Sequence, residues 1–285
     1  MEATLTHMNA LLVSLLGSAV VLLPAASAAA QAGLAPHRAV YDMSLERSGA
    51  SAGINALTGR MVFEIKGDAC AGYEQSMRFV TETLDRNGKT SVTDQRSTFF
   101  EYADKRRFRF RTDQYRNDRL AEKTQGRATR DAGQKRLKVD LKSPKKKVLD
   151  IKRPVLFPVE HSIQLLAAAQ AGKKLFTVDL FDGSDKGEKV YATTAAVGPK
   201  KPPGVNGELH KAPTAKPLDQ LGAWPVSLSY FEVDGKRRDG VPNYELSFLY
   251  FENGVSRKLF IDYGTFSMRG KLVKLEMLPQ GPCDK

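Results

Sequence analysis

Side chains that alternate between apolar and polar along most of the chain constrain this fold more than any other feature. In residues 57–66, the apolar Met61, Phe63 and Ile65 alternate with the charged Arg60, Glu64 and Lys66, and residues 135–142 repeat the pattern. A period of two places one set of side chains on a buried face and the other set in water, which is typical of antiparallel β-strands. The other segments with this pattern are 39–47, 73–82, 91–102, 106–115, 120–130, 174–181, 189–197, 225–233, 243–252, 256–263 and 266–278.

Turn-forming dipeptides separate these segments. Asn253-Gly254 lies between two alternating runs and predicts a tight hairpin, because Asn-Gly tolerates the positive φ angles of such a turn. Asn87-Gly88, Asp182-Gly183 and Asp234-Gly235 mark further turns. The sequence therefore predicts a predominantly β fold in which neighbouring strands are antiparallel.

One segment has the spacing of an α-helix. Pro158 suits the first helical position, Glu160 favours the positive N-terminal end of the helix dipole, and Gly172 suits a C-terminal cap. Apolar residues between them form a broad stripe. We expect a helix that packs on the sheet as a plug or lid; the alternative is a docking helix for a partner.

The first thirty residues indicate a cleavable signal peptide. Leu11 to Leu23 is an apolar run, Pro24 ends it, and the small residues Ala25 to Ala30 suit a cleavage site. An uncleaved anchor is the alternative, but the run is shorter than the ~20 residues that cross a bilayer. Residues 1–30 are therefore expected to be removed, and the protein to reach the periplasm with no transmembrane segment.

Net charge limits the partners of an exported chain. The formal charge is +12, from 44 Lys and Arg against 32 Asp and Glu. Export excludes nucleic acid, so anionic lipid head groups, acidic polysaccharide or an acidic protein are the available partners.

The chain has 2 cysteines, Cys70 and Cys283. An even number in an oxidising compartment predicts a disulfide, which would connect the C-terminus to the first third of the mature chain. A metal site is disfavoured because no His or Cys lies at ligand spacing to either one.

A basic run at residues 105–111 is the sharpest charge feature. On a strand, Phe108 and Phe110 share one face, whereas Arg107, Arg109 and Arg111 share the other. Two interpretations stay open: a solvated strand face, or a face that contacts an anionic envelope surface.

Evidence for catalysis is weak. Residues 49–53 have the letters of a hydrolase nucleophile elbow around Ser51, but that motif needs a strand before it and a helix after it. Here two expected strands flank it. His161 and His37 are the only histidines in regions expected to fold, and nothing places either near a nucleophile. We expect no catalytic, metal or cofactor site.

Residues 198–222 contain five prolines and predict a flexible loop. A domain boundary there is possible in principle, but the predicted disulfide joins both sides of the loop. We therefore expect residues 31–285 to form a single β domain.

Several short segments together resemble one family, the EipB-like periplasmic proteins of alphaproteobacteria. The segments are residues 35–41, 157–161, 182–185 with 187–191, 224–227, and 251–257 with 262–264. The resemblance implies a β-spiral or an open, overlapping barrel with one helix and a disulfide between Cys70 and Cys283. It also implies a role in envelope integrity under stress, and it carries no catalytic residues.

The functional expectation is a non-catalytic protein, expected to be a monomer, that maintains the cell envelope by binding. Its partner would be an envelope lipid or a periplasmic protein. The alternative is a periplasmic hydrolase that uses Ser51 or His161.

Overall fold

A single antiparallel sheet dominates the computed structural model, which describes residues 33–204, 213–233 and 240–281. Within these residues the sheet has 14 strands, in the order β8-β7-β6-β5-β4-β3-β2-β1-β14-β13-β12-β11-β10-β9. The strands are β1 (His37–Ser48), β2 (Ile54–Asp68), β3 (Gly72–Asp85), β4 (Thr90–Tyr102), β5 (Arg107–Arg116), β6 (Arg119–Arg130), β7 (Leu137–Ser143), β8 (Lys147–Ile151), β9 (Leu175–Leu180), β10 (Tyr191–Val197), β11 (Ala223–Glu232), β12 (Tyr244–Phe251), β13 (Ser256–Asp262) and β14 (Phe266–Met277). The predicted β fold is confirmed.

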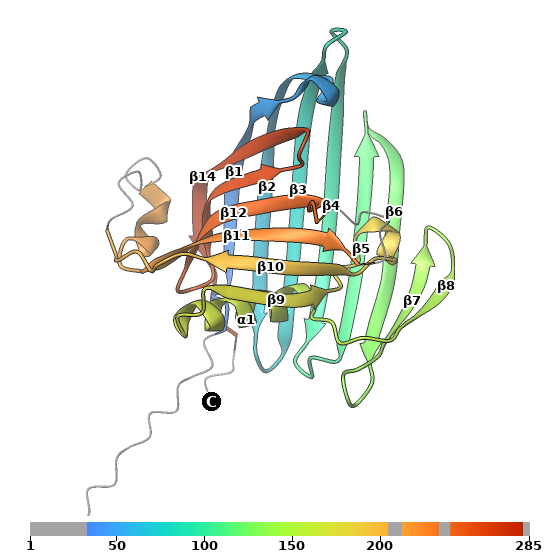
Figure 1. The fold of residues 1–285 in the computed structure, drawn as a ribbon, viewed down its shortest axis with the longest axis vertical. Coiled ribbons are helices and arrows are strands. Elements are labelled where there is room, and N and C mark those ends of the chain that lie inside the picture. The colour runs from blue at the N-terminus through green and yellow to red at the C-terminus, as the bar shows by residue number, and fades with distance from the viewer. Residues whose placement is uncertain (1–32, 205–212, 234–239, 282–285) are drawn as a thin grey trace, which may run out of the picture. The chain divides into compact units, whose positions relative to one another are not determined.

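The first and last strands meet in the middle of the sheet. His37 on β1 lies opposite Ile65 on β2 and, on its other side, opposite Met277 on β14. Two meanders extend from this seam, one from β1 to β8 and the other from β14 to β9. Figure 1 shows the second meander lying across the first, so that the sheet overlaps itself. Strands β8 and β9 lie at the two ends of the strand order, which makes the sheet open, and an isolated bridge joins Leu180 of β9 to Leu156.

Apolar side chains from both meanders fill the space between the layers. One cluster joins Trp224 and Tyr250 of the second meander to Ile65 and Tyr73 of the first. A second cluster surrounds the seam between β1 and β14. A third contains Phe108 of β5 together with residues that flank the helix and β9. Each large side chain that is fully buried contributes roughly 1.5–3 kcal/mol, so these clusters hold the overlap together.

The predicted helix is α1 (Pro158–Gln170). Pro158 occupies its first turn, and Gly172 follows the C-cap residue Ala171 with φ of 72°, a left-handed conformation that glycine adopts without strain. Leu165 and Leu166 are buried in the cluster that contains Trp224. α1 therefore packs against the sheet as a plug, one of the two predicted roles.

Two features differ from the sequence-based expectation. The short edge strand β8 was missed, because the lysines at 145–147 interrupt its alternating pattern. The expectation of a flexible loop does not hold over η4 (Pro213–Leu218), a 3-10 helix whose Leu218 is 0% exposed. Residues 205–212 of that loop lie outside the described part of the chain, as does the expected signal peptide.

Candidate anion-contact face and the buried network behind it

The arginines of β5 lie on the exposed outer face of the sheet. Burial alternates along β5, so that Arg107, Arg109 and Arg111 are exposed while Phe108 and Phe110 are almost completely buried. Phe108 stacks on Phe157 with ring centroids 4.9 Å apart. Burial of the two phenylalanines therefore fixes the direction of the three arginines.

Neighbouring strands add an aromatic surface to this face. Phe100 on β4 lies opposite Arg109, whose guanidinium carbon is 5.1 Å from the centre of the Phe100 ring. Tyr102, two residues further along β4, has the guanidinium carbon of Arg107 at 4.1 Å from its ring centre. A cation above a ring is attracted by the quadrupole of the ring, so the aromatic rings hold both arginines in place.

Acidic residues neutralise only part of this surface. Arg107 pairs with Asp104 at 2.7 Å, and Arg111 pairs with Asp113 at 2.6 Å. Arg109 has Arg127 of β6 directly opposite and, in the described part of the chain, no carboxylate within ion-pair distance. We call Phe100, Tyr102, Arg107, Arg109, Arg111 and Arg127 the outer arginine face.

Arg127 also has an acidic neighbour. Asp140 lies opposite it on β7 and forms its own ion pair with Lys138, at 3.8 Å. The positive charge that the chain leaves uncompensated is therefore centred on Arg109, between Phe100 and Arg127.

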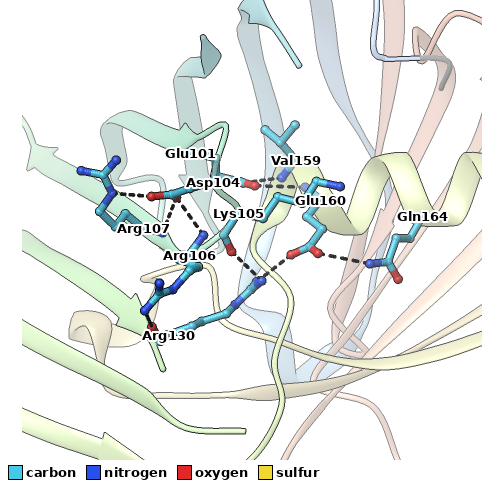
Figure 2. A network of polar contacts seen from close by, with 9 residues as sticks. All are labelled: Glu101, Asp104, Lys105, Arg106, Arg107, Arg130, Val159, Glu160 and Gln164. Atoms are coloured by element: carbon cyan, nitrogen blue, oxygen red, sulfur yellow. Dashed lines mark hydrogen bonds and ion pairs between the residues drawn. The ribbon is translucent and has the colours of Figure 1, made fainter. Parts of the chain in front are cut away.

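Glu101 lies between Phe100 and Tyr102 but points to the interior. Its carboxylate accepts hydrogen bonds from the backbone N–H groups of Val159 at 2.5 Å and Glu160 at 3.0 Å (Figure 2). These N–H groups belong to the first turn of α1, where the N-cap residue Phe157 provides no side-chain cap. Glu101 therefore caps α1 from strand β4, and its carboxylate lies at the positive, N-terminal end of the helix dipole.

A buried ion pair reinforces this anchor. Arg130, which is 1% exposed, places its guanidinium 2.7 Å from the carboxylate of Glu160. It also donates a hydrogen bond to the backbone oxygen of Lys105 at 2.8 Å and lies 4.0 Å from the centre of the Phe157 ring. The two charged groups meet at a poor hydrogen-bonding angle, so their attraction is mainly electrostatic. Figure 2 shows how this network connects the β4–β5 turn with α1.

Burial changes the protonation of Glu101. Desolvation raises the pKa of this carboxyl from 4.5 to about 7, although the two backbone hydrogen bonds act in the opposite direction. The negative charge of Glu160 raises the pKa further, and Arg130 lowers it. Glu101 therefore changes charge near neutral pH.

Comparisons with known proteins identify the family. The EipB-like family model matches residues 28–279. The chain belongs to the EipB-like family. The Cell envelope integrity protein EipB of Brucella abortus (strain 2308) is 42% identical over 257 residues, covering 90% of this chain and 89% of the Brucella protein.

A solved structure supports the same assignment. The crystal structure of a beta-barrel-like protein of a domain of unknown function, also from Brucella abortus, superimposes with a TM-score of 0.78 at 37% identity. The match covers 87% of this chain and 100% of the other. The predicted resemblance is thus confirmed, and this EipB-like chain is a member of an envelope-integrity family.

The two cysteines of this EipB-like chain are only partly described. Cys70 lies in the turn between β2 and β3, where Asp68 Oδ1 accepts a hydrogen bond from its backbone N–H at 2.8 Å. Cys283 lies outside the described residues. Gly281, two residues before it, is so close to Asp68 that a β-carbon at position 281 would lie 2.9 Å from Asp68 Cγ. This proximity favours the Cys70–Cys283 bridge, which stays a prediction.

Ser51 and His161 occupy different environments. Ser51 lies in η1 (Ala50–Ala52), a short 3-10 helix between β1 and β2, without the following α-helix that a nucleophile elbow requires. His161 is buried in α1, where its Nε2 is 3.1 Å from the hydroxyl oxygen of Thr193. Desolvation lowers the pKa of His161 to about 4, so its imidazole is neutral at pH 7.

The described residues of this EipB-like chain contain no group of three or more His, Cys, Asp or Glu side chains that could hold a metal ion. None of the helices among them has both the length and the apolar character of a membrane span.

Sequence reasoning identified Arg107, Arg109 and Arg111 but missed their neighbours. Arg127 and the two aromatic residues join the face only through strand register. Glu101 could have been noticed as an acidic residue at an inward position of β4, between Phe100 and Tyr102. Nothing in the sequence indicates its partner, because α1 begins more than fifty residues later.

Proposed function

We propose that this EipB-like protein works in the periplasm as a non-catalytic binding protein of the cell envelope. The outer arginine face would contact the anionic head groups of envelope lipids. Membership of an envelope-integrity family supports the general role. The predicted signal peptide supports the location.

The observation that carries the proposal is the charge surplus at Arg109. Two arginines directly opposite each other repel, and the chain supplies Arg109 with no described carboxylate that would offset this repulsion. An external anion would remove the repulsion. A guanidinium donates two parallel hydrogen bonds to a phosphate, which makes arginine well suited to phospholipid head groups.

Aromatic residues on the same face favour a membrane surface over a free ion. Tyr102 and Phe100 are only partly buried and lie beside the arginines. Tyrosine is enriched at membrane–water interfaces, where its ring contacts the head-group region. Clustered basic residues near an anionic membrane contribute roughly 1 kcal/mol each.

The inner faces of the sheet offer a less suitable surface for a lipid chain. Their apolar side chains already pack against α1 and the opposite layer. For this reason we place the lipid contact outside. Catalysis is not part of the proposal, because Ser51 and His161 lie in different elements and neither has the environment of a nucleophile or a general base.

Vesicle flotation tests the proposal directly. The wild-type protein should float with phosphatidylglycerol-containing vesicles and not with phosphatidylcholine vesicles, and binding should weaken as salt rises. Arg109→Gln/Arg127→Gln should lose most of this binding. Lys271→Gln/Lys274→Gln removes the same charge from exposed positions of β14 and should bind like wild type.

Complementation then connects binding to the envelope. A strain without the gene should be sensitive to detergent and to cell-wall antibiotics. The Arg109→Gln/Arg127→Gln variant should rescue it poorly and the lysine control fully. Equal flotation of both variants would refute the lipid contact. Capture of an acidic periplasmic protein, lost only in the arginine variant, would replace the lipid by a protein partner.

A further inference from the structure

A pocket of ≈ 650 Å³ lies where α1 ends against the second meander. Its walls come from the last turn of α1 and the residues after it, the end of β10, the start of β11 and the turn after β12. Figure 1 shows α1 beside β9 at the lower margin of the sheet. Among the described residues, none of β4, β5 or β6 lines this pocket, so it shares no residue with the outer arginine face.

The floor of the pocket is apolar. Ala169, Val197 and Trp224 line it, and all three are buried members of the core cluster that contains Leu166. Pro199 adds apolar surface at the exposed rim. The pocket therefore leaves one margin of this core cluster accessible. An apolar ligand that covered the margin would gain about 25 cal/mol for each Å² removed from water.

The rim of the pocket is basic. Lys173 and Lys174 follow α1, and Lys200 follows β10. The single carboxylate in the lining belongs to Glu252, so three lysines against one glutamate leave a net charge of +2. Glu252 is fully used, because one of its oxygens pairs with Lys200 and the other accepts a hydrogen bond from the backbone N–H of Gly222 at 2.9 Å. The surplus charge is therefore that of Lys173 and Lys174.

These two lysines have no partner that would neutralise them. Within the described part of the chain, neither lies within ion-pair distance of a carboxylate. Basic residues after a helix can also donate to its last carbonyl groups. Here the oxygens of Ala167, Ala168 and Ala169 already accept backbone N–H groups from residues 171–173. Both ammonium groups therefore remain available to a ligand.

Lys200 is held in a fixed position at the rim. Its ammonium nitrogen lies 5.1 Å from the ring centre of Trp224 and forms the ion pair with Glu252. Its side chain also passes so close to Gly222 that a β-carbon there would collide with Lys200 Cε. A side chain that is ordered in advance loses little entropy when a ligand binds. The fold thus provides a fixed cation directly above the apolar floor.

The combination of floor and rim restricts the ligand. An uncharged sugar would leave the surplus charge unpaired, and a small polar anion would leave the apolar floor in water. A molecule with an anionic group at one end and an apolar chain at the other satisfies both parts. Pockets of this volume hold single small molecules. The space between the layers is filled by the core cluster, so the chain would cover its margin and not enter it.

We infer that the pocket at the end of α1 binds a small amphiphile with one apolar chain and an anionic head, a carboxylate or a phosphate. Lys173 and Lys174 would contact the head, whereas Val197 and Trp224 would contact the chain. This site goes beyond the proposed function, because it takes up a single molecule on a different part of the protein from the membrane contact.

Fluorescence quenching tests the site, since Trp224 is the only tryptophan of the chain. The probe is ω-bromododecanoate, whose bromine quenches tryptophan on contact, used below its critical micelle concentration. We expect saturable quenching in the wild-type protein. The uncharged ω-bromododecanol should bind more weakly because it lacks the head, and ω-bromohexanoate because it loses apolar contact. Relief of quenching by dodecanoate and by dodecyl phosphate, compared at equal concentration, shows which head is preferred.

Variants connect the quenching to the two lysines. Lys173→Gln/Lys174→Gln should weaken binding of ω-bromododecanoate about fivefold, the loss expected for two exposed ion pairs, and leave ω-bromododecanol unaffected. Lys271→Gln/Lys274→Gln removes the same charge from exposed positions of β14 and should change the affinity less than twofold. Circular dichroism melts verify that both variants are folded.

Three results would overturn the inference: quenching that does not saturate, equal affinity for the bromo acid and the bromo alcohol, or an equal loss of affinity in the two lysine variants. Flotation with phosphatidylglycerol vesicles separates the pocket from the lipid contact. Lys173→Gln/Lys174→Gln should float like wild type, whereas Arg109→Gln/Arg127→Gln should fail to float and still be quenched. Loss of flotation in the first variant, or of quenching in the second, would merge the two sites and overturn the inference as well.

Discussion

Arg109 of β5 and Arg127 of β6 lie directly opposite each other on the exposed face of the sheet. Like charges at such positions destabilise a sheet by a few tenths of a kcal/mol up to about 1 kcal/mol. A protein that retains this arrangement gives up stability at a place where an anion would restore it. Under the proposed lipid contact, binding and stability make opposite demands on the same two residues.

A double-mutant cycle should detect this repulsion. Arg109→Gln and Arg127→Gln are compared singly and together by urea unfolding at low salt. We expect an unfavourable coupling of about 0.5 kcal/mol, which should disappear at about 1 M NaCl because the Debye length is then about 3 Å. Because the cycle compares the double variant with both single variants, the contributions of Phe100 and Asp140 to the free energy of unfolding cancel. A favourable coupling would show that the pair is already neutralised within the chain.

The buried pair of Arg130 and Glu160 should respond differently from exposed pairs. Arg130→Met leaves the carboxylate of Glu160 buried without its partner, so the free energy of unfolding should fall by about 3–5 kcal/mol. Adding Glu160→Gln should recover a large part of that loss. Arg136→Met, which breaks an exposed pair with Asp150, should cost less than about 1 kcal/mol. Equal losses in the two single variants would contradict the anchoring role of Arg130.

Alternation along β5 was sufficient to predict which side chains point outward. It could not predict which residues face each other across strands. The β5–β6 register shifts by one residue between Gln114 and Tyr115. Without this bulge, counting back from the turn would place Gly126 opposite Arg109 and remove the arginine pair. Irregularities of this kind depend on packing across the sheet and leave no clear mark in a single sequence.

Packing also explains why the prediction of a flexible loop at residues 198–222 was wrong over η4. Five prolines indicate a loop, but they do not show whether one leucine of that loop is buried. Leu218 packs with Phe251, Leu249 and Val255 in the cluster at the seam. The stabilising contact is long-range, so local composition could not predict it.

Leu218→Ala therefore tests whether η4 is part of the core. Removal of a fully buried leucine side chain should reduce the free energy of unfolding by about 2–5 kcal/mol. Leu120→Ala is the matched control, because Leu120 is 54% exposed and its loss should cost less than about 0.5 kcal/mol. Urea titrations followed by tryptophan fluorescence measure both. A similar small loss in both variants would mean that η4 contributes little to the fold.

The predicted disulfide should be a major source of stability. A bridge that closes a loop of this length contributes up to about 5 kcal/mol in the chain-entropy model. Cys70→Ser should lower the free energy of unfolding by that order, and a reducing agent should lower wild type to the level of the variant. The variant itself should not respond to the reducing agent. A wild-type protein that is indifferent to reduction would rule out the Cys70–Cys283 bridge.

Glu101 and His161 should make opposite contributions to the pH dependence of stability. The folded-state pKa of Glu101 is raised from 4.5 to about 7, so its contribution is present below pH 4.5 and is lost as pH rises through 7. The folded-state pKa of His161 is lowered from 6.5 to about 4, so its contribution is present above pH 6.5 and is lost as pH falls toward 4. Each effect amounts to about 3 kcal/mol, and they oppose each other between pH 4.5 and 6.5.

Glu101→Gln separates the two titrations. The amide keeps a carbonyl oxygen that can accept a backbone N–H of α1, but it cannot ionise. The free energy of unfolding of the variant, minus that of wild type, should therefore increase by about 3 kcal/mol between pH 4.5 and pH 7.5. Urea unfolding at four pH values in this range measures the difference. The control is Glu74→Gln, at an exposed position of the neighbouring strand β3. The difference in free energy of unfolding between this control and wild type should not rise with pH in the same way. A flat difference for Glu101→Gln would mean that Glu101 keeps an ordinary pKa, so that the burial at the start of α1 does not control its charge.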